Sequence, residues 1–200
     1  MGFDIKNTKF WKPLGFQFLC LLLDIYSRKL YKLGQQKIFM SELKLTIELV
    51  PSTAWGVSIY QICTHNKKLK IWKDFKESLF FKEGRKCFIC GTDNIKLEAH
   101  EFWSYDEVNH IQKLIAIHHL CHLCHKIKHS GLWFETDYGL ENLKKQNLTT
   151  EDLINHFCKV NNCKKEDFYK HKEEAFKIFN ERSNYNWTQD FGEYNYLLKS

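Results

Sequence analysis

The chain has 200 residues, 44% of them hydrophobic and 16% aromatic, which is enough apolar material for one medium-sized domain. Two prolines and no stretch rich in Pro, Gly or Ser exclude a long disordered linker. The net charge is +6, and basic side chains crowd residues 65–86, a pattern that fits a phosphate-backbone partner and a solvated helix face equally well.

Residues 1–39 are predicted to be an N-terminal extension. Their apolar run, residues 16–23 (FQFLCLLL), is far shorter than the roughly 20 residues of a membrane span. The sequence that follows it lacks the small-x-small pattern of a signal-peptide cleavage site. We therefore expect a short amphipathic or buried helix over residues 14–33, no membrane partner and a cytoplasmic location.

Residues 40–86 are predicted to form an N-terminal element with a strand and helices. Residues 43–50 (LKLTIELV) alternate and contain β-branched side chains, which predicts a strand. The Pro-Ser-Thr sequence that follows predicts a helix starting near Ala54. Residues 71–81 carry apolar side chains at helical spacing, and Gly84 would end that helix.

Residues 87–135 contain the strongest signal in the sequence, two C-x-x-C pairs. Each pair presents two thiolates to one ion, and together they predict a closed structural zinc site. Gly91 allows the tight turn of a zinc knuckle. This spacing is typical of metal binding in a reducing compartment, not of secreted disulfides. The predicted ligands are Cys87, Cys90, Cys121 and Cys124, whereas Cys20, Cys63, Cys158 and Cys163 are interpreted as buried thiols.

Three histidines near these pairs predict a second site. His125 and His129 are four residues apart, so on a helix they share one face and can hold one divalent ion. His100, expected on a strand within reach of that face, could act as a general base, because an imidazole titrates near neutrality. The alternatives are a buried core histidine at position 100 and surface histidines at the other two positions.

Residues 136–200 are predicted to be a C-terminal helical region. One helix is expected near residues 150–160 with Thr150 as its N-cap, and a longer one over residues 164–182. The aromatic tail at residues 184–198 should pack back on the body. Trp103 and Tyr105 are interpreted as core side chains and not as base-stacking platforms.

The motifs CFIC, LEAHEFWSYD and LCHLCHKIKHSG together resemble the HNH nucleases, also called ββα-metal or His-Me finger nucleases, and in particular a bacterial zinc-knuckle subgroup. The clear similarity covers residues 87–131, with weaker similarity at 46–55 and 173–183. It implies an α+β fold, in which a ββα-metal finger with a four-cysteine zinc site is flanked by N- and C-terminal helices. It also implies that His100 is the general base and that His125 and His129 bind the catalytic metal.

Two positions depart from the family pattern. Ala99 stands where many members have a further metal ligand, and Glu98 or Glu101 could substitute for it. Ala116 stands where the family's asparagine usually orients the base. His110 and Gln112 are possible replacements for that asparagine.

The expected function is therefore metal-dependent endonuclease activity on nucleic acid, with double-stranded DNA as the substrate that the resemblance implies. The expected cofactors are structural Zn2+ and a catalytic divalent ion, Mg2+ first and Mn2+, Zn2+ or Ni2+ as alternatives. Lysines in residues 67–76 and 126–128 would hold the phosphate backbone. The alternatives are a catalytically inactive, zinc-stabilised nucleic-acid-binding module, which Ala99 and Ala116 favour, and a zinc-stabilised protein-interaction factor. Oligomeric state does not follow from the sequence.

Overall fold

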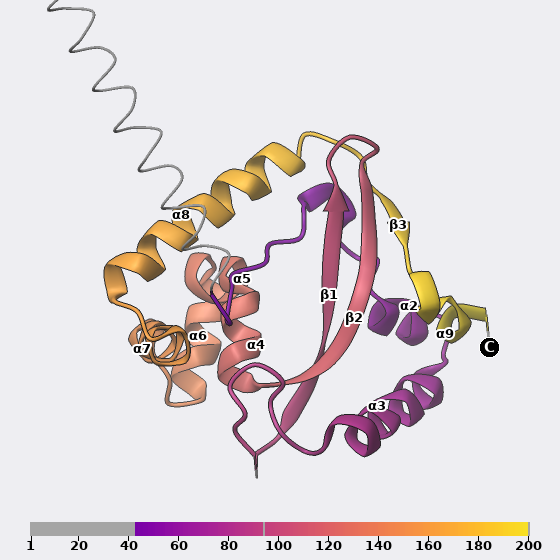
Figure 1. Ribbon diagram of the computed structural model, residues 1–200, viewed down its shortest axis with the longest axis horizontal. Coiled ribbons are helices and arrows are strands. Elements are labelled where there is room, and N and C mark those ends of the chain that lie inside the picture. The colour runs from indigo at the N-terminus through magenta and orange to yellow at the C-terminus, as the bar shows by residue number, and fades with distance from the viewer. Residues whose placement is uncertain (1–42, 94, 200) are drawn as a thin grey trace, which may run out of the picture. The chain divides into compact units, whose positions relative to one another are not determined.

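A long β-hairpin runs through the middle of the structure, with helices on both sides of it (Figure 1). The computed structural model describes residues 43–93 and 95–199, and Lys44–Ser200 forms one compact unit. Before the hairpin come η1 (Ser52–Ala54), α2 (Ile59–His65) and α3 (Leu69–Glu83). After it come α4 (His122–Lys128), α5 (Ser130–Glu135), α6 (Asp137–Lys145), α7 (Thr150–Asn161), α8 (Lys165–Arg182), β3 (Thr188–Asp190), η2 (Gly192–Asn195) and α9 (Tyr196–Lys199). The mixed α+β class is as predicted.

The hairpin consists of β1 (Leu97–Asp106) and β2 (Ile111–Cys121), which pair antiparallel. The register shifts between Phe102 and Trp103, and β3 adds a short parallel pairing at the start of β2. Successive side chains of a strand point to opposite faces. His100 therefore faces one side of the hairpin, while its neighbours Ala99 and Glu101 face the other.

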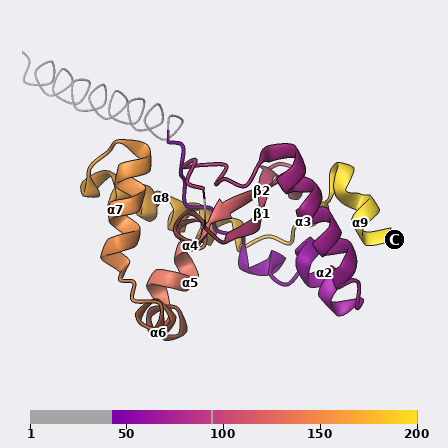
Figure 2. The same cartoon turned by 90° about the horizontal axis from the view of Figure 1, so that it is seen from below.

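The face that carries Ala99 and Trp103 packs against α2, α3 and the C-terminal tail. Figures 1 and 2 show these helices together on one side of the hairpin. The chain between Gln189 and Lys199 returns to this core, as predicted for the aromatic tail. The buried cluster consists of Ile59, Cys63, Trp72, Phe75, Leu79, Leu114, Ile117, Phe191 and Leu197. Each such buried side chain contributes about 1.5–3 kcal/mol.

Helices α4 to α8 lie on the other side of the hairpin in both views (Figures 1 and 2). Helix α4 follows β2 directly, because Cys121 is both the last residue of the strand and the N-cap of the helix. Helices α7 and α8 contribute a second group of buried side chains that includes Leu153, Phe157 and Phe168. This arrangement places the start of α4 beside both the hairpin and α7.

The strand predicted over residues 43–50 is wrong. The segment is extended, but its backbone hydrogen bonds go to two side chains and to Lys128 O of α4 in place of a neighbouring strand. Asn161 accepts a hydrogen bond from Leu45 N and donates one to Leu45 O, at 2.9 and 2.8 Å. His171 Nε2 accepts from Ile47 N at 2.8 Å. Leu45 and Ile47 are buried, so the alternating pattern correctly marked the inward side chains.

The other helix predictions have mixed outcomes. The predicted helix over residues 71–81 is α3, ended by Gly84 with φ of 76°. The helix expected from Ala54 is wrong, because a single 3-10 turn occupies Ser52–Ala54 and α2 begins at Ile59 behind the N-cap Ser58. Helices α7 and α8 match the two predicted C-terminal helices, but Thr149 and not Thr150 is the N-cap of α7. The helix predicted over residues 14–33 lies outside the described residues.

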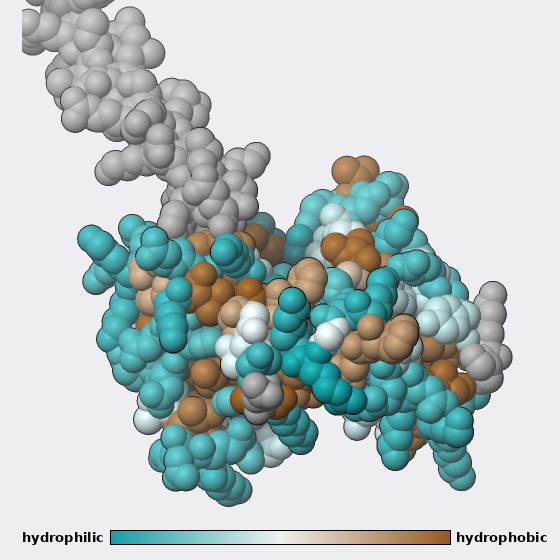
Figure 3. Space-filling view, turned by 60° about the horizontal axis from the view of Figure 1, so that its bottom comes forward, coloured by the Kyte–Doolittle hydropathy of each residue, from teal (hydrophilic) through white to brown (hydrophobic). Residues whose placement is uncertain are grey.

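Hydrophilic side chains dominate the face shown in Figure 3, and the apolar ones between them form small separate groups. Within the described part of the chain, no helix combines the length and apolarity needed to cross a membrane.

Candidate metal centres

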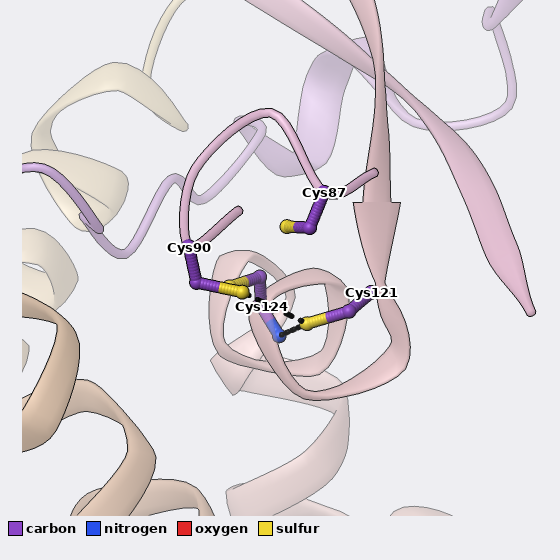
Figure 4. Close-up of side chains that lie close together, drawn as sticks. All are labelled: Cys87, Cys90, Cys121 and Cys124. Carbon is purple, nitrogen blue, oxygen red and sulfur yellow. Dashed lines mark hydrogen bonds between the residues drawn. The ribbon is translucent and has the colours of Figure 1, made fainter. Parts of the chain in front are cut away.

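Four cysteine side chains converge between the loop before β1 and the start of α4. Their sulfur atoms all lie within 4.8 Å of one another, and Cys90 Sγ is 3.7 Å from Cys121 Sγ. Figure 4 shows the sulfurs pointing into one shared space. All but Cys90 are buried. The two C-x-x-C pairs therefore come together as predicted, in a cluster that could bind a structural metal such as zinc.

Local backbone geometry positions each pair. In the first pair, Gly91 N donates to Cys87 O at 2.9 Å and Cys87 N donates to Thr92 O at 2.8 Å, which closes a tight turn. Gly91 has φ of 74°, a conformation that favours glycine, as the knuckle interpretation expected. In the second pair, Cys124 N donates to Cys121 Sγ at 3.4 Å, so the first cysteine caps the helix that carries the second.

The electrostatics of the thiols fit a cation at this place. Hydrogen bonds from Cys121 and Cys124 hold the pKa of the Cys87 thiol far below its usual range. The pKa of Cys124 is raised by its contacts with Cys121 and Cys87 and by burial. Four thiolates cannot share this space without a compensating cation, and a bound zinc ion deprotonates all its cysteine ligands. The donor set fits zinc in type, number and closeness.

A second cluster joins His100 of β1 to His125 and His129 at α4. Their candidate ligand atoms lie within 4.8 Å of one another. The ring centroid of His100 lies 5.2 Å from that of His125 and 4.9 Å from that of His129. The three rings are close to perpendicular to one another. His125 lies in α4, whereas His129 is its C-cap, and His129 N donates to His125 O at 3.2 Å. The structure thus brings together the three histidines that the sequence singled out.

Glu98 and not Glu101 reaches this cluster. A Glu98 carboxylate oxygen lies 2.5 Å from His125 Nδ1, and this hydrogen bond lowers the pKa of Glu98. A carboxylate on Nδ1 fixes the proton there and leaves Nε2 as a potential ligand. Glu101 points to the opposite face, where it accepts a hydrogen bond from Ile59 N at 2.8 Å, and burial raises its pKa to about 7.

Two of the three imidazoles, those of His100 and His129, have a lowered pKa and favour the neutral form at neutral pH. Burial is the first cause of the lowered pKa of His100, followed by the nearby His129 and His125. The pKa of His129 is lowered to about 4, again by burial first and His125 second. His100 is 5% exposed, and its Nε2 is buried without a hydrogen-bond partner among the described residues. A neutral, unpartnered ring nitrogen can accept a proton or a metal ion.

The proposed replacements for the missing asparagine are not at the histidine cluster. His110 stacks on Tyr185 at the tip of the hairpin, and Gln112 donates to Tyr105 Oη at 3.0 Å. Ala116 pairs with Phe102, whereas the residue opposite His100 in the register is His118. His118 in turn stacks on Phe88 and lies 2.8 Å from Glu83. Sequence spacing alone gave no sign of His118 at this place.

A further residue that sequence analysis missed is His156 of α7. Its Nε2 lies 3.2 Å from Cys124 Sγ and 4.0 Å from Cys121 Sγ. A lone histidine 32 positions after Cys124 carries no spacing signal, so only the tertiary structure could find it.

The lysines expected to hold a phosphate backbone differ in their availability. Lys126 and Lys128 are 4% and 1% exposed, which makes them unsuitable for that role. Lys126 Nζ lies over the Trp133 ring, and Lys128 Nζ forms an ion pair with Glu48 and donates to Thr46 Oγ1 at 2.9 Å. Leaving one such buried ammonium unpaired costs several kcal/mol, so these contacts are structural. Lys67, Lys70 and Lys73 are exposed, but Lys70 and Lys73 belong to α3, and Lys67 precedes it, on the side of the hairpin opposite α4 (Figure 1).

The remaining predictions concern side chains outside both clusters. Trp103 packs against Phe191 at the edge of the core, and Tyr105 packs against Trp187; both side chains are partly buried. Cys63 is buried as expected, whereas Cys158 and Cys163 are only partly buried. Cys20 lies outside the described residues.

Comparison of the chain with protein-family models, with curated proteins and with solved structures finds no match.

Proposed function

We propose that this protein is a metal-dependent endonuclease that hydrolyses phosphodiester bonds of nucleic acid, with double-stranded DNA as the expected substrate. The observation that carries the proposal is the convergence of His100, His125 and His129 where β1 meets α4. Three imidazoles in one place combine potential metal ligands with a potential base, the two functions that metal-assisted phosphodiester hydrolysis requires.

The surroundings of the histidines support the same proposal. A β-hairpin followed directly by a helix is the arrangement that the resemblance to HNH nucleases implies, with the base on the first strand and the ligands on the helix. The four-cysteine cluster lies at the junction of β2 and α4. A zinc ion there would hold the helix against the hairpin and so support the position of the histidines.

In the proposed mechanism, His125 and His129 would hold a divalent ion, which would supply Lewis-acid stabilisation of the charge that develops on the scissile phosphate. Glu98 holds the His125 ring by its Nδ1. His100 removes a proton from water, whose oxygen attacks phosphorus as the bond to the 3′-oxygen breaks. The leaving 3′-oxygen takes a proton from solvent, and the products are a 5′-phosphate and a 3′-hydroxyl, as the resemblance implies.

The composition of the histidine cluster favours a transition metal over Mg2+. Imidazole nitrogens suit ions such as Zn2+ and Ni2+, whereas Mg2+ prefers oxygen ligands. The carboxylate nearest to the cluster, Glu98, is engaged by His125 Nδ1. We therefore place Zn2+ or Ni2+ ahead of Mg2+ as the ion to test.

One observation favours the second candidate, an inactive zinc-stabilised nucleic-acid-binding module. Ala99 packs against the core on the face opposite the histidines, and Ala116 pairs with Phe102. Neither position can supply the extra ligand or the orienting group that active members of the family have. This candidate predicts salt-dependent binding of DNA without cleavage and a single zinc ion per chain.

Plasmid nicking and metal content, measured on the same preparations, test the proposal. The purified chain is incubated with supercoiled DNA in EDTA, Mg2+, Mn2+, Zn2+ or Ni2+, beside His100→Ala and the control His65→Ala. His65 is an exposed histidine of α2, outside both clusters. We expect metal-dependent nicking that His65→Ala retains and His100→Ala loses by at least about 100-fold, the usual contribution of a general base.

Metal content then separates the two roles open to His100. A base variant keeps the second ion and loses only cleavage, whereas a ligand variant loses the ion as well. Nicking by His100→Ala at the wild-type rate would rule out the assigned base. Tight DNA binding without cleavage in any metal would favour the inactive module instead.

A further inference from the structure

His156 links helix α7 to the cysteine cluster. Its Nε2 lies 3.2 Å from Cys124 Sγ, within the range of an N–H···S hydrogen bond, and 4.0 Å from Cys121 Sγ. The three residues come from the end of β2, the first turn of α4 and the middle of α7. The contact is therefore tertiary and independent of the C-x-x-C spacing that defines the cluster.

The position of His156 is fixed by the packing of its helix. Thr149 and Asp152 form a reciprocal capping box at the start of α7. On either side of His156, Leu153 and Phe157 are fully buried. At the other end of the helix, Asn161 makes both hydrogen bonds to the backbone of Leu45. Helix packing therefore fixes the backbone of His156 beside the cluster, and its partly buried imidazole reaches the sulfurs from there.

The charge of the cluster gives this contact its function. Four thiolates around one Zn2+ carry a net negative charge, and burying such charge is costly unless hydrogen-bond donors compensate it. Cys124 is 0% exposed, so solvent water does not reach its sulfur. Cys121 Sγ already accepts from Cys124 N, and Thr92 Oγ1 lies 3.3 Å from Cys90 Sγ. For the buried Cys124 sulfur, His156 is in place to donate.

We propose that His156 donates its Nε2–H to the Cys124 thiolate of the zinc-loaded site and thereby fastens α7 to the metal. Zinc is satisfied by four tetrahedral ligands, so four thiolates leave His156 as a positioning residue outside the coordination sphere. The inference rests on the cysteine cluster holding zinc, and it goes beyond the resemblance, which assigns His156 no role.

The test is zinc affinity, measured by competition with a chromophoric chelator on the full chain. His156→Ala is compared with wild type, with His156→Gln and with Asn155→Ala, a control at the adjacent exposed position of α7. Loss of an outer hydrogen bond to a ligand typically weakens metal binding by about 10–100-fold. We expect that loss for His156→Ala, a partial recovery for His156→Gln and wild-type affinity for Asn155→Ala.

Wild-type affinity in His156→Ala would overturn the inference. A wild-type protein that purifies without zinc would also overturn it, but metal analysis of that sample shows that the cysteine site has failed and not merely the hydrogen bond. A measurement on the wild type covers the case in which the variants do not fold. The nitrogen chemical shifts of the His156 ring should show the proton on Nε2, and a proton on Nδ1 alone would contradict the proposal.

Discussion

His171 is a buried imidazole of α8. Its Nε2 must stay unprotonated to accept the hydrogen bond that holds the segment at residues 43–50. Its Nε2 accepts from Ile47 N, and the ring is 4% exposed. Burial, followed by the positive charge of Lys128, lowers the pKa of His171 to about 4. In the unfolded chain the pKa is about 6.5, so protonation favours the unfolded state.

This residue is therefore expected to make the fold sensitive to acid. Its contribution is complete above about pH 6.5 and is lost toward pH 4, by at most ~1.4 kcal/mol per pH unit. Urea unfolding between about pH 7 and pH 5.5 should show a steeper loss of stability for wild type than for His171→Gln, which keeps an acceptor but does not titrate. Parallel pH profiles of the two proteins would contradict this role.

Single residues also show what the sequence could predict about the site. The cysteine pairs and the His125–His129 pair were predictable because their ligands are neighbours within one turn, where spacing determines geometry. His118 and His156 were not predictable, since strand register and helix packing bring them to their places. Whether Glu98 or Glu101 reaches the histidines was likewise not predictable, because it depends on which face of β1 meets α4.

At the scale of elements, helices α5 and α6 approach each other so closely that one position accepts no side chain. A Cβ atom at Gly139 of α6 would lie 2.0 Å from Leu132 O of α5. At Gly131 of α5 the nearest atom to such a Cβ is Leu49 Cδ2, at the ordinary contact distance of 3.5 Å. The two glycines thus form a matched pair for testing this packing.

Gly139→Ala is expected to destabilise the protein by roughly 3 kcal/mol, because the backbone of α5 must move to relieve the overlap. Gly131→Ala should be neutral, or stabilising by up to about 1 kcal/mol, since alanine favours the helix. Chemical denaturation of both variants measures the difference. Equal stability of the two variants would mean that α5 and α6 are packed less closely than described.

The failed strand prediction has a physical reason at this same scale. Alternation along residues 43–50 reports which side chains point inward, and Leu45 and Ile47 do so. It does not report what satisfies the backbone. Asn161 and His171, more than 100 positions later, take the role of a partner strand. The helices α3, α7 and α8 were predictable because their apolar spacing and their hydrogen bonds are both local.

At the scale of the whole molecule, the cysteine cluster brings together segments that are far apart in the sequence. The cluster holds the loop before β1, the end of β2 and the start of α4, and His156 adds α7. A structural zinc site typically contributes on the order of 10 kcal/mol or more, which is comparable to the total stability of a domain at about 5–15 kcal/mol. The folded state should therefore depend on zinc.

Removal of zinc by a strong chelator is expected to abolish the near-ultraviolet circular dichroism of the packed aromatic side chains, and added zinc should restore it. Cys90→Ser should behave like the chelated protein, whereas Cys163→Ser, outside the cluster, should keep its zinc and its spectrum. An unchanged spectrum after complete zinc removal would show that the apolar cores are sufficient without the ion.

The shortness of α4 has a consequence for the order in which ions enter and leave. Cys124 and His125 are consecutive residues of this seven-residue helix, so one backbone segment serves both clusters. An ion that holds α4 in place at one cluster should therefore raise the affinity of the other cluster for its own ion. Such thermodynamic coupling acts equally in both directions. The protein would then pass between fully loaded and empty states with few partly loaded intermediates, and an ion at the histidines would slow the escape of zinc from the thiolates.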